Sequence, residues 1–161
     1  MKANDGSGNN SLRDGWITPG WIFDPLMKQY KFTVDCCATD ENKKAQFFSN
    51  DFLNWSDNSF NYRSCHVCWM NPPFSLAWKM FEHFFKVVKK GIAIYRCDNF
   101  ETGIWQKVIF PNCSWVFIPD RRVCYDGLDG DGARFPSALI GFNVSLPENL
   151  EGVCLKRVVE G

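Results

Sequence analysis

The sequence predicts one α/β domain in which helices flank a mainly parallel sheet. Short apolar runs typical of buried strands alternate along the chain with segments of helical length. The clearest helical segment, residues 77–90, has an apolar face and lies between two such runs, residues 67–70 and 92–95. A chain of 161 residues has the size of a single domain. We therefore expect one folded domain at residues 14–161, after a disordered polar tail at residues 1–13.

The first predicted elements are a helix and a short strand. Thr18 is the expected N-cap of the helix, Pro19 suits its first position, and the helix ends near Tyr30. The mostly apolar residues 32–38 predict a strand that ends in small side chains. Before the next strand we expect a loop at residues 39–42, a helical turn at residues 42–44 and two core anchors, Phe47 and Phe48.

The remaining elements continue the alternation of strands and helices. Ser75 is the expected N-cap of the helix at residues 77–90. Lys89 and Lys90 suit its last turn, where the helix dipole favours cations, and Gly91 suits the position after it. Downstream we expect, in order, a strand at 92–95, a helix at 101–110, a strand at 114–118, a loop at 120–135, a strand at 137–143 and a last strand near 153–158.

Composition limits the class of protein. The 18 basic and 18 acidic residues cancel, which argues against a protein that coats nucleic acid non-specifically but leaves room for an enzyme with a local basic rim. With no signal peptide and no apolar run of membrane-spanning length, we expect a cytoplasmic protein with reduced cysteines and no membrane partner. Cys65 and Cys68 have zinc-ligand spacing, but a strand would point them to opposite faces, so we expect no metal site.

The most informative stretch is Asn71-Pro72-Pro73-Phe74, directly after the strand at residues 67–70. Proline cannot continue a central strand, so Asn71 is expected at the strand's carboxyl end, where open α/β sheets bind ligands. The Asn71 side-chain oxygen and the Pro72 carbonyl form a pair of acceptors for the two hydrogens of an exocyclic amino group. Phe74 offers a flat face to the ring that carries this amino group. The structural alternative is a proline-rich loop that only closes the strand.

These four residues resemble motif IV of the amino methyltransferases, Asp/Asn/Ser-Pro-Pro-Tyr/Phe/Trp. Residues 16–142 as a whole resemble the small phage DNA N-6-adenine methyltransferases. The resemblance implies a compact Rossmann-like fold, S-adenosylmethionine as methyl donor and adenine in double-stranded DNA as acceptor. It also implies modification of phage DNA against host restriction, in the host cytoplasm. The matching pieces are Trp16-Ile17-Thr18-Pro19, Phe23-Asp24, residues 32–38, Asp40-Glu41-Asn42, Trp55, residues 69–74 and residues 135–139.

The resemblance also implies roles for residues in the donor site. Asp35 would bind the amino-acid end of the donor, and Thr18 with Pro19 would help to hold its carboxylate. The small residues Cys36, Cys37 and Ala38 would let the backbone approach closely, and Asp51 and Phe52 would bind the adenosine. Many methyltransferases carry a Gly-x-Gly loop here, which this chain replaces by Cys37-Ala38-Thr39. The structural alternatives are a turn cap for Asp35 and helix N-caps for Asp51 and Thr18.

Adenine would have to leave the DNA stack to enter a pocket over Phe74. Asn71 and Pro72 would then accept the two amino hydrogens, and the methyl group would transfer in line from the positively charged sulfur. The proton would leave the nitrogen afterwards, so that no strong general base would be needed. DNA contacts are expected from the Gly-rich loop at residues 120–135, at the same sheet edge. The arginines expected to bind DNA are Arg121, Arg122 and Arg134. The structural alternative for this loop is a solvated segment with ordinary salt bridges.

Other functions remain open. The same Asn-Pro-Pro-aromatic tip can present cytosine N4, an RNA base or a protein glutamine for methylation. A different class is a degenerate module of this fold that holds nucleic acid without turnover; the missing Gly-x-Gly loop favours it, and the intact Asn71 tip argues against it. A structural module that binds zinc through its cysteines is the third reading.

Overall fold

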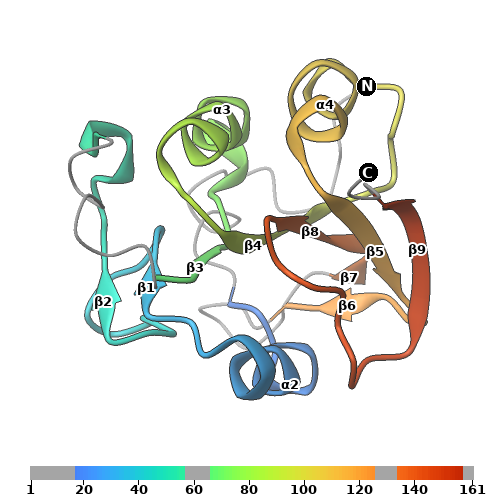
Figure 1. Ribbon diagram of the computed structural model, residues 1–161, viewed down its shortest axis with the longest axis horizontal. Helices are drawn as coiled ribbons and strands as arrows, with labels where there is room; N and C mark the ends of the chain where they lie inside the picture. The colour runs from blue at the N-terminus through green and yellow to red at the C-terminus, as the bar shows by residue number, and fades with distance from the viewer. Residues whose placement is uncertain (1–16, 57–65, 126–133, 158–161) are drawn as a thin grey trace.

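A seven-stranded sheet with helices on both faces forms the centre of the computed structural model (Figure 1). The structure describes residues 17–56, 66–125 and 134–157. The order of the strands across the sheet is β2-β1-β3-β4-β8-β5-β9. The predicted tail at residues 1–13 lies outside the described residues, as does Cys65.

Four strands form the parallel half of the sheet: β1 (Val34–Asp35), β2 (Phe47–Phe48), β3 (Cys68–Met70) and β4 (Gly91–Arg96). β1 pairs in parallel with β2 on one side and with β3 on the other, and β3 pairs in parallel with β4. The chain therefore runs outward from β1 to β2 and then crosses back to β3. This reversal makes a topological switch point between the carboxyl ends of β1 and β3, where α/β sheets bind ligands.

The other half of the sheet is antiparallel. β8 (Ser137–Phe142) lies between β4 and β5 (Trp115–Pro119) and runs against both, and β9 (Gly152–Arg157) runs against β5. In the part that the structure describes, the sheet thus has three parallel and three antiparallel pairings. The α/β class is confirmed, but the sheet is mixed rather than mainly parallel. The difference arises after β5: the chain there forms a small antiparallel ribbon, β6 (Val123–Cys124) with β7 (Arg134–Phe135), and β8 then runs back against β5.

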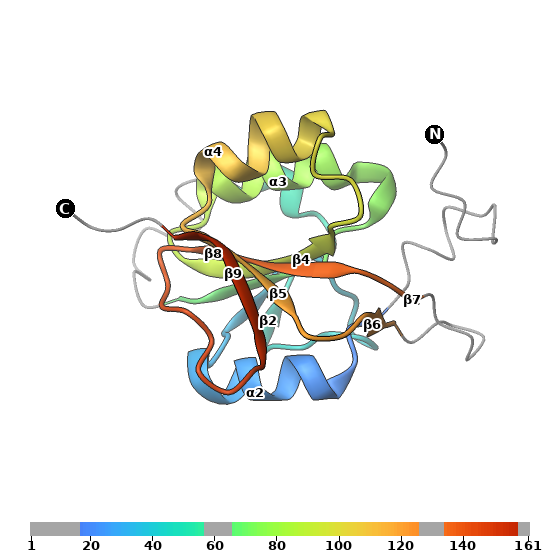
Figure 2. The same cartoon turned by 90° about the vertical axis from the view of Figure 1, so that its right-hand side faces the viewer.

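Helices cover both faces of the sheet, as the edge-on view shows (Figure 2). One face carries α3 (Ala77–Val87) and the helix made of η4 (Ile104–Ile109) and α4 (Phe110–Asn112), and the other carries α2 (Gly20–Tyr30). Alternation along β3 builds the two cores: Cys68 and Met70 pack with α3, whereas Trp69 packs with α2. Trp69 meets the Phe23 ring of α2 edge-on, with the ring centroids 5.1 Å apart. Within the described residues no helix is long and apolar enough to span a membrane.

The helix after β3 differs from its prediction at both ends. A 3₁₀ turn, η3 (Phe74–Leu76), contains Ser75, so Leu76 and not Ser75 precedes α3. The helix ends at Val87 because Val88 is already extended, which leaves Lys89 and Lys90 outside its last turn. Gly91 is the first residue of β4 rather than a helix cap. A Cβ there would lie 2.5 Å from the carbonyl oxygen of Cys68, so close approach to β3 requires glycine.

Three further expectations need correction. Phe47 and Phe48 form the edge strand β2, and Phe47 is 42% exposed, so it is no core anchor. The expected helical turn at residues 42–44 is absent from this described stretch, where a turn at residues 40–42 stands instead. The expected loop at residues 120–135 contains β6 and β7. The predicted strands corresponding to β3, β4, β5, β8 and β9 are confirmed to within about two residues at each end.

Candidate active site

The ends of β1 and β3 bring two predicted site residues to one edge of the sheet. Asp35 is the last residue of β1, and Asn71 directly follows β3. Both line a small polar pocket together with Thr18. The other residues that line this pocket are Ile17, Cys37, Asn42, Lys44 and Trp69. The pocket lies at the switch point of the sheet, where ligand binding is expected.

Asp35 is a buried carboxylate, with 2% of the residue exposed. Its Oδ1 accepts a hydrogen bond from the backbone N–H of Cys37 at 3.2 Å, and its Oδ2 accepts one from the backbone N–H of Lys44 at 2.9 Å. Burial raises the pKa of Asp35 to about 6, while the two backbone donors and the Lys44 charge oppose the rise. Asp35 therefore caps the turn after β1, as its structural alternative expects, and also faces the polar pocket.

Asn71 is held by Thr18. The Asn71 side-chain Nδ2 donates a hydrogen bond to Thr18 Oγ1 at 3.1 Å, and Thr18 is only 2% exposed. The expected N-cap role of Thr18 is wrong: Pro19 occupies the N-cap position of α2, with no side-chain cap there. Because the amide nitrogen of Asn71 faces Thr18, the amide oxygen is turned the other way.

A larger pocket of about 420 Å³ adjoins the polar one. The ends of three strands line it: residues 36–39 follow β1, residues 49–54 follow β2, and Asn71 and Pro73 follow β3. Cys37, Asn42 and Asn71 line both pockets, so the two are adjacent. Most residues predicted for the donor site therefore lie around the hollow that these two adjacent pockets form: Thr18, Asp35, Cys36, Cys37, Ala38, Asp51 and Phe52.

Ser49 fixes the predicted residue Asp51. The buried Ser49 Oγ donates to Asp51 Oδ1 at 2.8 Å and accepts the Asp51 backbone N–H at 3.1 Å. Asp51 occupies the N-cap position of the 3₁₀ helix η1 (Phe52–Asn54), but its side chain makes no cap hydrogen bond. Its carboxylate is instead held against Ser49, at the rim of the larger pocket.

Phe52, which is predicted to bind the adenosine of the donor, is a buried side chain packed against two other rings. It is 2% exposed, and its ring meets Trp55 and His83 edge-on, at centroid distances of 5.6 and 5.0 Å. Sequence reasoning assigned no role to eight residues that line the larger pocket: Thr39, Asn42, Ser49, Asn50, Leu53, Asn54, Leu76 and Met80. Asn42 could have been found from its turn, since its Oδ1 accepts the Thr39 backbone N–H at 2.7 Å.

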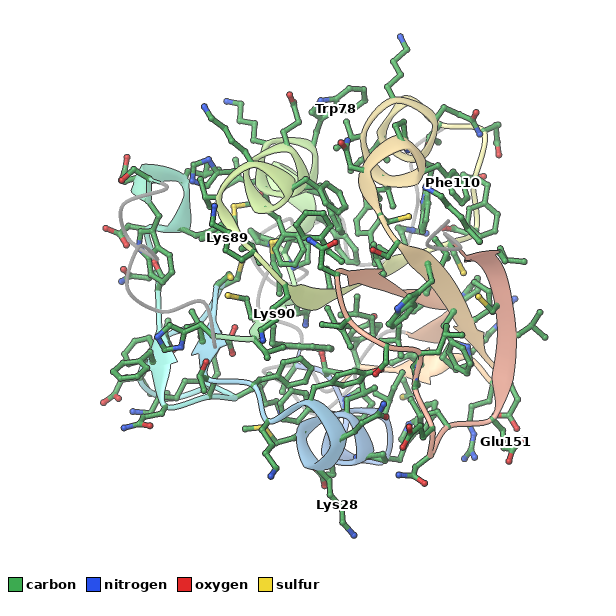
Figure 3. The ribbon with its side chains drawn as sticks, in the orientation of Figure 1. Lys28, Trp78, Lys89, Lys90, Phe110 and Glu151 are labelled. Atoms are coloured by element: carbon green, nitrogen blue, oxygen red, sulfur yellow. The ribbon has the colours of Figure 1, made fainter. Side chains whose placement is uncertain are left out.

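Phe74, the last residue of the Asn71-Pro72-Pro73-Phe74 loop, lines a second hollow of about 400 Å³. Leu76 lines both this hollow and the larger pocket, so it separates the two. Tyr95 and Trp78 also line it, and the Phe74 and Tyr95 rings lie 6.0 Å apart. Trp78 is 42% exposed and projects from the outer side of α3 (Figure 3). A Cβ on Gly103 would come within 2.9 Å of its indole ring, so the helix η4 packs closely against it.

The three predicted DNA-binding arginines follow β5 and begin β7. β5 runs in the same direction as β3 and β4, because β4 and β5 both run against β8. Arg121 and Arg122, which follow β5, therefore lie at the end of the sheet where these strands have their carboxyl ends, as Asn71 does. Both are exposed. The Arg121 guanidinium lies 4.6 Å from the centroid of the Trp21 ring, and its Nε is 3.4 Å from Asp120 Oδ1. Arg134 is the first residue of β7, paired with Cys124.

A comparison with known families shows to which family the chain belongs. The sequence model of the DNA N-6-adenine-methyltransferase (Dam) family matches residues 6–99, more than half of the 161 residues. The chain belongs to the DNA N-6-adenine-methyltransferase (Dam) family. The family predicted from the sequence is thereby confirmed, and with it a general activity as a DNA adenine methyltransferase that needs a methyl donor. No curated protein and no solved structure gives a significant match.

The Dam-family match covers the whole of the two adjacent pockets. It includes β1, β2, β3, the loop at Asn71 and β4, and it ends before helix η4. Among the described residues of this Dam-family chain, no three His, Cys, Asp or Glu side chains gather closely enough to hold a metal ion.

Proposed function

We propose that the chain transfers the methyl group of S-adenosylmethionine to N6 of adenine in double-stranded DNA, with Asn71-Pro72-Pro73-Phe74 as its catalytic loop. The observation that carries this proposal is the position of Asn71. It stands at the switch point of the sheet, lines both adjacent pockets, and is oriented by Thr18. A residue so placed can present a target amino group to a donor bound in the hollow beside it.

The residues of the hollow suit the chemistry of this donor. S-adenosylmethionine, when bound, supplies a methyl group attached to a positively charged sulfur. The polar pocket offers the Asp35 carboxylate as an acceptor for the ammonium of the donor, with the Thr18 hydroxyl beside Asn71 for its carboxylate. The larger pocket offers the Asp51 carboxylate to the ribose hydroxyls and apolar side chains to the adenine, Phe52, Leu53 and Met80.

The sheet supports a Rossmann-like assignment. Parallel strands run through β2, β1, β3 and β4, helices lie on both faces, and the strand order reverses beside Asp35 and Asn71. Doubly wound folds bind their cofactors in this crevice. The antiparallel strands β8 and β9 extend the sheet away from the site and do not interrupt the crevice.

The catalytic step needs the amino nitrogen of adenine to become more nucleophilic. In our account the extruded base stacks on Phe74, whose ring lines the second hollow with Tyr95. The Asn71 Oδ1 and the Pro72 carbonyl each accept one amino hydrogen, which draws the nitrogen towards a geometry with an available lone pair. The hydrogen bond from Asn71 Nδ2 to Thr18 favours this use, since it commits the nitrogen end of the amide elsewhere.

DNA would approach along the same edge of the sheet. Arg121 and Arg122 are exposed there and can bind phosphates, and Arg134 begins the neighbouring ribbon strand β7. The biological role that we propose, protection of phage DNA against host restriction, rests on the sequence resemblance alone.

The test is to incubate the purified protein with unmethylated DNA and isotope-labelled S-adenosylmethionine and to identify the methylated nucleosides by mass spectrometry. We expect N6-methyladenine. N4-methylcytosine would change the acceptor while keeping the mechanism. Donor binding without any methylated DNA would favour an RNA or protein acceptor. Absence of donor binding by calorimetry would contradict the proposal and favour a module that only binds nucleic acid.

A further inference from the structure

An ion pair stands at the carboxyl end of β4, the strand next to β3. Arg96 is the last residue of β4, and its Nε and Nη2 donate to Oδ1 and Oδ2 of Asp98 at 2.8 and 2.6 Å. This two-pronged geometry is the strongest that arginine makes with a carboxylate. The side chains are only 16% and 31% exposed, and the bond lowers the pKa of Asp98. The pair is therefore more rigid than an ordinary surface ion pair.

The same guanidinium lies over the ring of Phe74. The Arg96 Cζ is 5.7 Å from the Phe74 ring centroid, within the range of a cation–π contact. Tyr95, the neighbour of Arg96 on β4, approaches the same ring at 6.0 Å. Two consecutive residues of β4 therefore contact the Phe74 ring.

The backbone beneath Arg96 is also fixed. β4 is an interior strand, and Arg96 itself is paired with Ser137 of β8. The indole Nε1 of the buried Trp105 donates to the Arg96 carbonyl oxygen at 3.2 Å. A side chain that begins on such a support and is held at its far end by Asp98 has few conformations left, so it can hold the ring against it in one orientation.

We propose that Arg96 and Asp98 are positioning residues for the target base: Asp98 fixes the Arg96 guanidinium, and the guanidinium fixes the Phe74 ring on which the base stacks. This inference rests on the proposed function, because it assigns Phe74 the role of stacking platform. Arg96 acts through Phe74 and Asp98 acts through Arg96. A competing role for Arg96 is direct contact with a DNA phosphate, because the bond to Asp98 uses only two of the five guanidinium hydrogens.

The first test compares single variants in steady-state methylation of DNA. Arg96→Met keeps the apolar stem but removes the cation, and Asp98→Asn removes the charge that anchors it. We expect each to lower kcat about three- to tenfold, the range of a partly shielded cation–π contact, with an unchanged Kd for the donor. Lys28→Met is the matched control for Arg96→Met. It removes one positive charge in the same way, but on the exposed side of α2, away from the sheet (Figure 3). It should leave kcat unchanged.

The second test asks whether the residues act in series. In a Phe74→Leu background, Arg96→Met should lower kcat no further, and in an Arg96→Met background, Asp98→Asn should lower it no further. An undiminished effect of Arg96→Met in the Phe74→Leu background would overturn the proposal. A weaker DNA affinity of Arg96→Met, with the slope of log K against log salt concentration smaller by about 1, would also overturn the proposal, because Arg96 would then bind a DNA phosphate itself.

A third measurement does not depend on activity. With 4-fluorophenylalanine at position 74, the fluorine resonance should shift and broaden alike in Arg96→Met and Asp98→Asn, and stay unchanged in Lys28→Met. An unchanged resonance in the first two variants would overturn the inference even in an active enzyme. If the native protein makes no N6-methyladenine, the proposed function fails, while the resonance still reports whether the pair holds the ring.

Discussion

Asn71 donates a hydrogen bond from its side-chain Nδ2 to Oγ1 of Thr18 at 3.1 Å, across 53 residues of sequence. The bond joins the segment that leads into α2 to the loop that leaves β3. It lies beside Asp35 in the polar pocket at the switch point of the sheet. The bond therefore links the two sequence motifs on which the family resemblance most depends, Thr18-Pro19 and Asn71-Pro72-Pro73-Phe74.

Thr18→Val should lower kcat for DNA methylation. The substitution keeps the shape of the side chain but removes the hydroxyl that holds the Asn71 amide. A hydrogen bond of this kind contributes about 0.5–1.5 kcal/mol, which corresponds to a loss of about two- to tenfold. Thr33→Val is the control, because the Thr33 hydroxyl also makes a hydrogen bond, with His66 Nδ1 at 2.7 Å, but lies before β1 at the opposite edge. Equal rates for native protein and Thr18→Val would show that the bond does not orient Asn71.

Donor binding should depend on pH through Asp35. Its pKa is raised to about 6 by burial, so most Asp35 side chains are neutral at pH 5 and ionised at pH 7. Because the ammonium of the donor prefers the ionised carboxylate, its affinity should increase about tenfold between these values. Isothermal titration calorimetry with S-adenosylmethionine measures this directly. Asp35→Asn should bind more weakly at pH 7 and show a flat profile over this range; a flat profile in the native protein would place the ammonium elsewhere.

The same group should make the folded protein less stable as pH rises. The folded-state pKa of about 6 lies above the ordinary aspartate pKa of 3.8, so between these values the folded protein keeps a proton that the unfolded chain has released. The free energy of unfolding should therefore fall from pH 4 to pH 7, by about 2–3 kcal/mol from this group, because each pKa unit corresponds to about 1.4 kcal/mol. Urea denaturation of native protein and Asp35→Asn, compared at each pH, isolates the contribution. A difference between the two that does not vary with pH would contradict it.

Much of the framework follows from local sequence. The strands β3, β4 and β8 are short apolar runs, and α3 has an apolar face, so each is visible without knowledge of the rest. The position of Asn71 at a strand end follows from the two prolines behind it. These features depend on steric and solvation preferences that act within a few residues.

Other features depend on contacts that no local pattern contains. Thr18 has the sequence of an N-cap, but the hydrogen bond with Asn71 places its hydroxyl elsewhere. Phe47 looks like a core residue, yet it lies on an edge strand and is exposed. The direction of β8 is set by the ribbon before it, and Ser49 gains its role only because Asp51 folds back on it.

Arg121→Gln and Arg122→Gln should each weaken DNA binding with little effect on donor binding. Both side chains are exposed at the edge of the sheet that carries Asn71, where they can contact phosphates. Each lost phosphate contact should reduce the slope of log K against log salt concentration by about 1. Fluorescence anisotropy with labelled duplex DNA over a salt series measures the slope, with Lys28→Gln as a control on α2. Unchanged slopes in both arginine variants would identify their loop as an ordinary solvated segment.

In the proposed mechanism, the side-chain oxygen of Asn71 holds the target amino group. The most direct test measures N6-methyladenine by nucleoside mass spectrometry for native protein, Asn71→Ala and Asn71→Asp, with donor binding checked in each by calorimetry. An aspartate keeps the acceptor oxygen, and the Thr18 hydroxyl can donate to it instead of accepting. We therefore predict no methyladenine from Asn71→Ala, substantial activity from Asn71→Asp, and donor binding by all three. Methyladenine from Asn71→Ala at a near-native rate would contradict the account.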